Sequence, residues 1–314
     1  MKPVILDVDT GVDDACALLL AARHPDLDLK AVTCVGGNVG IDDVVRNTLT
    51  VLEAAGRPDV PVARGAAVPL IQPVHAARHV HGEDGLGDLD WPRSTRSPDP
   101  RHAVELLRDV LRDAAATGEL VTLVPLAPMT NIALLLRTYP DAARGLREIV
   151  FMGGAAGIGN ATAAAEFNIW SDPGAAAIVL AAVRELEIPT TMYGLDVFHD
   201  VVVTLDQARA LSGSQSAELA GQLIIKRSER YQSDGAGIGD GGAVCAVIDP
   251  AGLTTQEYPV RVELSGEWSR GRTIVDTRPA IDVAHDPRAP AATVRVATAV
   301  DGKRYAELWL ATVS

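Results

Sequence analysis

Short runs of hydrophobic residues alternate, over the first two thirds of the chain, with longer segments in which hydrophobic positions recur at helical spacing. The short runs are apolar at consecutive positions, which is typical of strands buried on both faces of a parallel sheet. The predicted strands cover residues 4–8, 29–35, 60–63, 120–126, 148–152 and 190–193. The predicted helices cover residues 13–23, 41–55, 102–116, 129–137 and 173–183. Repeated strand–helix units predict an α/β fold with a mostly parallel, Rossmann-like central sheet flanked by helices.

The pattern changes after residue 200. It predicts helices at 205–212 and 216–231, a glycine-rich loop at 235–242 leading into a helix, a hairpin of strands 260–264 and 273–276, a strand at 294–297 and a closing helix at 302–313. Long loops are expected at 69–101 and 153–168. The C-terminal third thus adds a small β-hairpin and extra helices. Without repeats or a low-complexity linker, the sequence predicts a single domain over residues 1–314.

The net charge of the chain disfavours two classes of partner, nucleic acids and anionic membranes. The 41 acidic residues outnumber the 28 basic ones and give a net charge of −13, with no cluster of Lys or Arg to reverse it locally. Such a chain should repel nucleic-acid phosphates and anionic membranes, so we expect neither as a partner. Acids interrupt the first apolar run, which predicts neither a signal peptide nor a membrane span. Three scattered cysteines indicate a cytoplasmic protein without disulfides.

Four carboxylates follow the first predicted strand within eight residues: Asp7, Asp9, Asp13 and Asp14. Side chains two positions apart on a strand point the same way, so Asp7 and Asp9 can converge. Asp13 and Asp14 fall in the first helical turn, where the helix dipole favours negative charge. Carboxylates this close raise one another's pKa unless a cation neutralises them. An all-oxygen set suits a hard divalent ion, calcium or magnesium.

The segment has two other interpretations. The acids could be surface helix caps, although their mutual repulsion between apolar segments disfavours that. The segment is also similar to the opening of haloacid-dehalogenase-like phosphatases, with Asp7 as nucleophile and Asp9 as acid/base. That family needs a later acidic pair at a strand end, and Asp42-Asp43 comes too early and opens a helix.

The second strand ends in the motif V-G-G-N-V at residues 35–39, where two glycines allow close approach of a ligand. Further motifs are P-V-A-R-G at 61–65, H-V-H-G at 79–82, V-P-L-A-P-M-T-N at 124–131, F-M-G-G at 151–154, G-N-A-T at 159–162, A-E-F-N at 165–168, G-L-D-V at 194–197 and I-D-P at 248–250. Together with the acidic cluster, this ordered series resembles the inosine-uridine-preferring nucleoside hydrolase family along nearly the whole chain.

The resemblance implies calcium-dependent hydrolysis of the N-glycosidic bond of ribonucleosides through an oxocarbenium-like transition state. It implies that Asp9, Asp14 and Asp240 bind Ca²⁺ with the backbone carbonyl of Leu126, where relatives often have Thr. Asp13 would be the general base. Residues implied to bind substrate are Asp7, which would also support the metal site, Asn38, Asn160, Glu166, Asn168 and Phe167, which could stack on the base. The family further implies a homodimer or homotetramer and a role in nucleoside salvage.

The chain differs from the family at a position that bears on how the nucleobase leaves. Relatives often carry a His that protonates the departing base where this chain has Gly239. His81 is our candidate for the donor, and His79 is the next; Cys245 or Tyr231 would be weaker substitutes, and a better leaving group would need none. The loss of this His also motivates an alternative function, a homologue that binds nucleosides with little or no turnover. An intact Asp13 argues against that alternative, because a pure binding protein needs no base.

Overall fold

The computed structural model describes residues 1–286, 288 and 290–314 of the chain. Its strands are β1 (Lys2–Val8), β2 (Leu27–Cys34), β3 (Val62–Arg64), β4 (Val121–Pro125), β5 (Leu146–Met152), β6 (Thr190–Tyr193), β7 (Val202–Thr204), β8 (Gly235–Gly237), β9 (Leu253–Val262), β10 (Thr273–Val275) and β11 (Ala292–Val300). Nine of them form one sheet in the order β10-β9-β11-β6-β5-β4-β1-β2-β3, and β7 pairs with β8 separately. From β3 to β11 every neighbouring pair is parallel. The prediction of a mostly parallel central sheet is confirmed.

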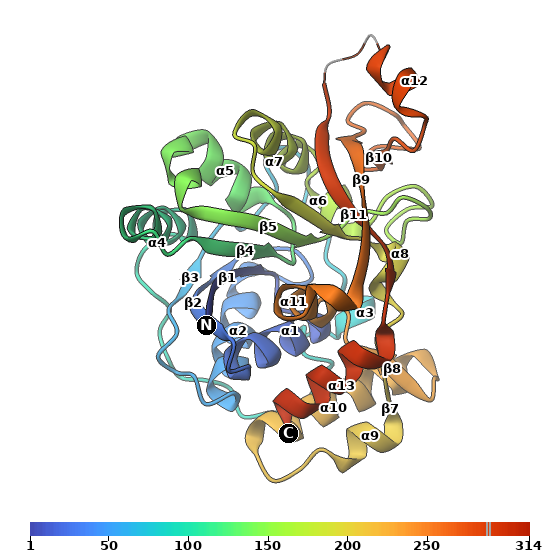
Figure 1. The fold of residues 1–314 in the computed structure, drawn as a ribbon. Coiled ribbons are helices and arrows are strands. Elements are labelled where there is room, and N and C mark those ends of the chain that lie inside the picture. Colours follow the sequence, from blue (N-terminus) through green and yellow to red (C-terminus); the bar gives the residue numbers. More distant parts are fainter. Residues whose placement is uncertain (287, 289) are drawn as a thin grey trace.

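Helices cover both faces of this sheet (Figure 1). The longer helices are α1 (Val12–Arg23), α2 (Ile41–Ala54), α4 (Ala103–Thr117), α5 (Thr130–Thr138), α7 (Pro173–Glu185), α10 (Gln215–Tyr231), α11 (Gly241–Ile248) and α13 (Gly302–Val313). The shorter ones are α3 (Arg78–His81), α6 (Phe167–Ser171), α8 (Leu195–Phe198), α9 (Leu205–Ala210), α12 (Ala280–Ala284) and the 3₁₀ turns η1 (Pro140–Gly145) and η2 (Pro250–Gly252). One buried core joins α1, α2, α10, α11 and α13 to the sheet, and a second joins α4, α5 and α7 to the other face.

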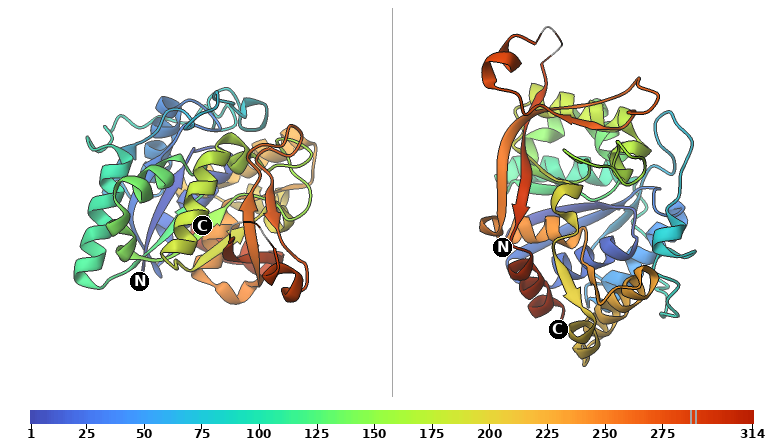
Figure 2. Two further views of the ribbon diagram at one scale, coloured as in Figure 1. Left: turned by 90° about the horizontal axis from the view of Figure 1, so that it is seen from above. Right: turned by 90° about the vertical axis from the view of Figure 1, so that its right-hand side faces the viewer.

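The C-terminal third differs from the prediction in three places. The predicted hairpin is part of the main sheet, because β9 begins at Leu253 and runs antiparallel to β11 before it pairs with β10. The first part of the predicted loop 235–242 is strand β8, which pairs with β7. Third, the short helix α12 was not predicted, and Figure 2 shows it at the far end of the β9–β11 pair, away from the C terminus. No described helix is long and apolar enough to cross a membrane.

The sheet reverses its winding between β1 and β4. The chain proceeds from β1 outward to β2 and β3, and then from β4 outward in the opposite direction to β5 and β6. In open α/β sheets, ligands bind beyond the carboxyl ends of the strands at such a switch point. The segments after β1, β2, β4 and β5 contain most of the predicted site residues, so the topology brings them to one edge.

Candidate active site

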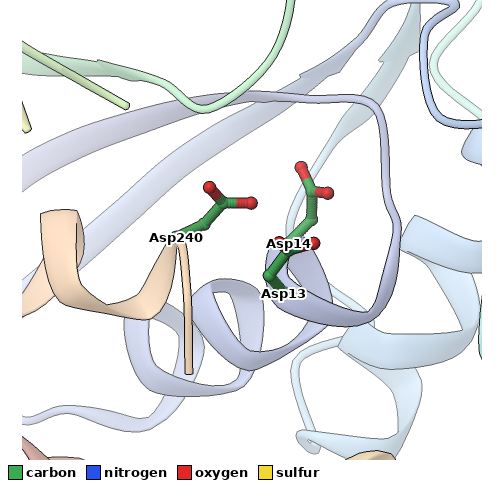
Figure 3. Close-up of side chains that lie close together, drawn as sticks. All are labelled: Asp13, Asp14 and Asp240. Carbon is green, nitrogen blue, oxygen red and sulfur yellow. The ribbon is translucent and has the colours of Figure 1, made fainter. Parts of the chain in front are cut away.

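The acidic cluster is built where α1 begins. The carboxylate of Asp14 accepts hydrogen bonds from the backbone N–H groups of Gly11 (2.9 Å) and Asp9 (3.2 Å), which caps the helix from inside its first turn. Asp240 precedes α11 and reaches toward Asp13 and Asp14 (Figure 3). Carboxylate oxygens of these three residues lie within 4.8 Å of one another, and all three residues are buried.

Asp9 lies beside this group and is held by Asn38. Its two carboxylate oxygens accept the backbone N–H of Asn38 (2.8 Å) and the side-chain amide of Asn38 (3.0 Å). A Cβ atom on Gly37 would collide with the Asp9 carboxylate, which explains the second glycine of the V-G-G-N-V motif. The carbonyl of Leu126, directly after β4, accepts the side-chain amide of Asn168 (2.9 Å). Asp9 and Leu126 are therefore near the site but outside the group of three carboxylates that the structure brings together.

The buried carboxylates are costly to ionise together. Burial, with a further contribution from Asp13, raises the pKa of Asp14 to about 7. Burial and repulsion from Asp14 raise the pKa of Asp9 well above its usual value, and burial and repulsion from Asp13 do the same for Asp240. A cation bound among these groups would offset both effects.

The residues present fit a hard divalent cation. The cluster offers only oxygen donors, with neither a His nor a Cys among the three carboxylates. Asp13 Oδ1 is buried and has no hydrogen-bond partner among the described residues, so an oxygen remains for a cation or a water molecule. The structure thus contains an acidic site able to hold a metal ion.

Asp13 differs from its neighbours in charge state. Burial alone would raise its pKa, but the positive charges of a protonated His81 and of Arg227 outweigh burial and hold the pKa below its usual value. Arg227 Nη1 lies 3.3 Å from Asp13 Oδ2, and His81 Nδ1 lies 3.6 Å from Asp13 Oδ1. Because burial lowers the pKa of His81 to about 4, Arg227 is the positive charge that remains beside Asp13 near neutral pH. Asp13 is therefore ready to accept a proton.

Polar residues of α6 and the loop before it face the cluster. The Glu166 carboxylate caps α6 by accepting the N–H groups of Asn168 (2.8 Å) and Ile169 (3.1 Å), and it also accepts the N–H of Gly154 (2.8 Å). Burial raises the pKa of Glu166 to about 7 against the opposing effect of these bonds. Asn160 accepts the N–H of Phe167 (2.9 Å), which ties the predicted ribose-binding loop to the helix.

These residues surround a cavity of about 390 Å³. Its lining includes the predicted site residues Asp13, Asn38, His81, Leu126, Asn160, Glu166, Phe167, Asn168 and Asp240. It also includes His79, Phe198, His199, Arg227 and Tyr231. The volume is that of a small-molecule site. Nine of the twelve predicted site residues thus line one cavity, whereas Asp7, Asp9 and Asp14 do not line it.

Comparison with known proteins identifies the family. The model of the family described as inosine-uridine preferring nucleoside hydrolase matches residues 4–307. The chain belongs to this family. The predicted recognition is confirmed, and with it the prediction of an enzyme that is a nucleoside hydrolase, an N-glycosidase.

Individual nucleoside hydrolases resemble the chain over almost its full length. A protein named pyrimidine-specific ribonucleoside hydrolase RihA from Citrobacter koseri is 39% identical over 281 residues, which cover 87% of this chain and 88% of the relative. The structure of a plant nucleoside hydrolase matches with a TM-score of 0.90 and 32% identity over 99% of this chain and 98% of that one. A purine-preferring ribonucleoside hydrolase from Gardnerella vaginalis matches with a TM-score of 0.87 and 31% identity, with the same coverage.

Asp7 is set apart from the cavity. It is fully buried, and its Oδ1 accepts the hydroxyl of Thr33 (2.5 Å) and the side-chain amide of Asn131 (2.8 Å). It does not line the cavity. This enclosed position suits support of the strand ends and weighs against the phosphatase alternative, in which Asp7 would have to attack a substrate.

The candidates for the proton donor occupy different positions. His81 ends α3 and is buried, and its Nδ1 accepts the N–H of Val12 (3.2 Å), so the neutral ring carries its proton on Nε2. His79 and Tyr231 line the cavity from exposed positions, whereas Cys245 is in the core of α11.

Gly239 has φ +54°, and a Cβ there would lie 2.5 Å from Asp13 Cβ and 2.8 Å from Phe198 Cζ. Because of these two contacts, a side chain at position 239 would require the neighbouring residues to shift.

Arg227 is a site residue that was not predicted from the sequence. Its side chain is only 10% exposed, and it lines the cavity beside Asp13. The helical spacing could have indicated it. Arg227 comes four residues after the buried Leu223 and three after the buried Ile224, so it lies on the apolar face of α10. A charged residue on that face is rarely buried without a partner. No motif marked the position.

Proposed function

We propose that the protein hydrolyses ribonucleosides to ribose and free base in a calcium-dependent reaction, with Asp13 as the general base. The observation that carries the proposal is the state of Asp13. It is a buried carboxylate whose pKa is lowered and which pairs with Arg227, at the wall of a cavity lined by amide and carboxylate groups. One of its oxygens has no hydrogen-bond partner among the described residues. A general base needs such an oxygen within reach of the reacting water.

Asp9, Asp14 and Asp240, with the carbonyl of Leu126, would hold the calcium ion. When bound, the ion would supply a positive charge that orders the attacking water and the ribose diol and acidifies that water modestly. The high pKa values of the buried acids support this assignment, because a cation neutralises their repulsion.

The chain's own residues would perform the remaining steps. Asn38, Asn160, Glu166 and Asn168 would orient the ribose through its hydroxyl groups, which can both donate and accept hydrogen bonds. Asp13 would take a proton from water as the water oxygen bonds to C1′ and the bond from C1′ to the base nitrogen breaks. The positive charge that develops on the sugar would be stabilised by the surrounding carboxylates.

Glu166 gives this proposal a pH dependence. Its pKa is raised from its ordinary value to about 7, so the carboxyl is neutral below that pH and ionised above it. If the ionised form binds ribose, kcat/KM should rise with pH until about 7 and fall about tenfold per unit below it. We expect Glu166→Gln to lack this limb, whereas Glu148→Gln, which changes an acid paired with Arg295, should keep it. An unchanged profile in Glu166→Gln would show that another group titrates.

His81 is our candidate for the group that assists the departing base. Because burial lowers its pKa to about 4, the ring is neutral near pH 7 and would donate a hydrogen bond from Nε2 without giving up the proton. We expect His81→Ala to lower kcat for nucleosides by ~10²-fold, the usual cost of removing one preorganised donor. His79→Ala is the matched control, since His79 lines the same cavity and was the second candidate. A larger loss in His79→Ala than in His81→Ala would reverse the assignment.

The test of the proposed function is release of free ribose from a panel of nucleosides with calcium present. The panel should contain uridine, cytidine, inosine and adenosine, because the similar proteins are named for pyrimidine and for purine preference. Ribose release that disappears in Asp13→Asn would support the hydrolase. Saturable binding without release would indicate the nucleoside-binding alternative, and phosphate release from a phosphomonoester would indicate the phosphatase.

Assembly and location remain expectations from the sequence. A homodimer or homotetramer is expected, and size-exclusion chromatography with light scattering would distinguish these from a monomer. The cytoplasmic location and the role in salvage follow from the family resemblance and the cysteine pattern.

A further inference from the structure

The cavity contains one permanent positive charge among otherwise acidic or neutral groups. Its acidic lining residues are Asp13, Glu166 and Asp240, and Arg227 is the one Arg or Lys that lines it among the described residues. A neutral His81 adds no charge near pH 7, because burial lowers its pKa to about 4. Cleavage of an N-glycosidic bond separates charge, since the sugar becomes positive as the base becomes negative. The negative carboxylates can stabilise the positive charge on the sugar, and the positive guanidinium of Arg227 can stabilise the negative charge on the departing nucleobase.

The contacts of Arg227 leave part of its donor capacity unused. Nη1 is buried and lacks a hydrogen-bond acceptor in the part of the chain that the structure describes. Its nearest charged neighbour is Asp13 Oδ2 at 3.3 Å, and the guanidinium carbon lies 5.9 Å from the centre of the Phe198 ring. A buried donor without an acceptor is costly, and a ligand that supplies an acceptor removes this cost. The side chain is 90% buried but still borders the cavity.

Because residue 239 is a glycine, the space beside Asp13 and Phe198 is available to the side chain of Arg227. A Cβ on Gly239 would lie beside Asp13 and Phe198, the same two residues that Arg227 contacts. With glycine at 239, the groups that can act at this end of the cavity must come from elsewhere in the chain, and α10 supplies a guanidinium.

We infer that Arg227 is a leaving-group residue, which donates hydrogen bonds to the departing base and stabilises it as an anion. The inference rests on the proposed hydrolysis of nucleosides. In the step itself, the electron pair of the broken C1′–N bond stays on the base nitrogen, and the attacking water supplies the new C1′–O bond and gives its proton to Asp13. Arg227 donates hydrogen bonds without losing a proton, since a guanidinium is always charged near neutral pH. An acceptor on the base, such as a carbonyl oxygen or a ring nitrogen, would receive them.

The experiment compares two kinds of riboside in wild-type protein and Arg227→Gln. Uridine and inosine have poor leaving groups, whereas para-nitrophenyl riboside releases a stable phenolate that needs little help. Because Arg227 also lies 3.3 Å from the general base Asp13, we expect Arg227→Gln to lower kcat/KM for both kinds of riboside. The loss for the nucleosides should exceed the loss for para-nitrophenyl riboside by ~10²-fold, the usual effect of removing one preorganised donor. Lys226→Gln is the matched control, because Lys226 is the adjacent residue of α10 and its side chain is 44% exposed.

Equal losses on both kinds of riboside would overturn the inference, because Arg227 would then act through Asp13 and not on the base. Unchanged activity on nucleosides would overturn it as well. Arg227→Lys, which keeps the charge, should recover part of the nucleoside activity, and this second variant covers a Gln variant that folds poorly. Failure of the proposed function is distinguishable, since wild-type protein would then release ribose from neither kind of substrate.

Discussion

Asp13→Asn is expected to lower kcat/KM for every nucleoside that the protein hydrolyses by about 10³-fold or more. The amide has nearly the shape of the carboxylate but cannot accept the proton of the attacking water, and general-base catalysis contributes ~10²- to 10⁴-fold. Asp13 is ionised and one of its oxygens has no hydrogen-bond partner among the described residues, so little else at the site can replace it. Steady-state rates of ribose release measure the effect.

The Asp13→Asn variant also distinguishes two possible roles of Asp13, general base and metal ligand. Asp13 belongs to the group of three carboxylates that could hold an ion, so geometry alone permits either role. We expect Asp13→Asn to keep the increase in melting temperature that calcium produces in wild-type protein. Asp206→Asn, at a side chain that is 97% exposed, should change neither activity nor melting temperature. Loss of the calcium effect together with activity would make Asp13 a ligand.

Removal of the metal should give the second large effect. Chelation is expected to abolish activity, and calcium at about a hundred times its dissociation constant should stabilise the fold by ~2.7 kcal/mol, or about 5 °C in melting temperature. The reason is that Asp9, Asp14 and Asp240 are buried close together, and burial and repulsion from neighbouring carboxylates raise the pKa of each. Differential scanning fluorimetry with and without calcium measures the shift.

Asp240→Asn tests whether Asp240 is one of the calcium ligands. Removing one of the repelling charges should raise the melting temperature of the metal-free protein and at the same time remove the calcium-dependent increase. Asp26→Asn, an exposed residue between α1 and β2, provides the comparison and should retain that increase. If Asp240→Asn kept both the full calcium effect and activity, the ligand assignment would be wrong.

The sequence was most informative where the site is local. Asp9 directly follows a buried strand, and Asp13 and Asp14 lie in the first turn of the next helix, so alternation along the strand and the position of the first helical turn were enough to group them. Asp240 is more than 200 residues away, and only the family resemblance connected it to the cluster before the fold placed the start of α11 against α1.

Other features needed the tertiary structure. Gly235–Gly237 has the composition of a loop, and it is a strand because β7 offers it a pairing edge. The polar positions of β9 before Val260 did not show the alternation of a strand, but β11 pairs with them along their whole length. Arg227 became significant only when α10 was seen to pack beside the cavity, since helical spacing marks a face and does not say what covers it.

The most direct test of the central claim is hydrolysis of a nucleoside in water enriched in heavy oxygen, followed by mass spectrometry of both products. The account predicts ribose and free base in equal amounts, with one heavy oxygen in the ribose and none in the base, and no products after chelation of the metal. Heavy oxygen in the base, or release of base without free ribose, would contradict attack of water on C1′.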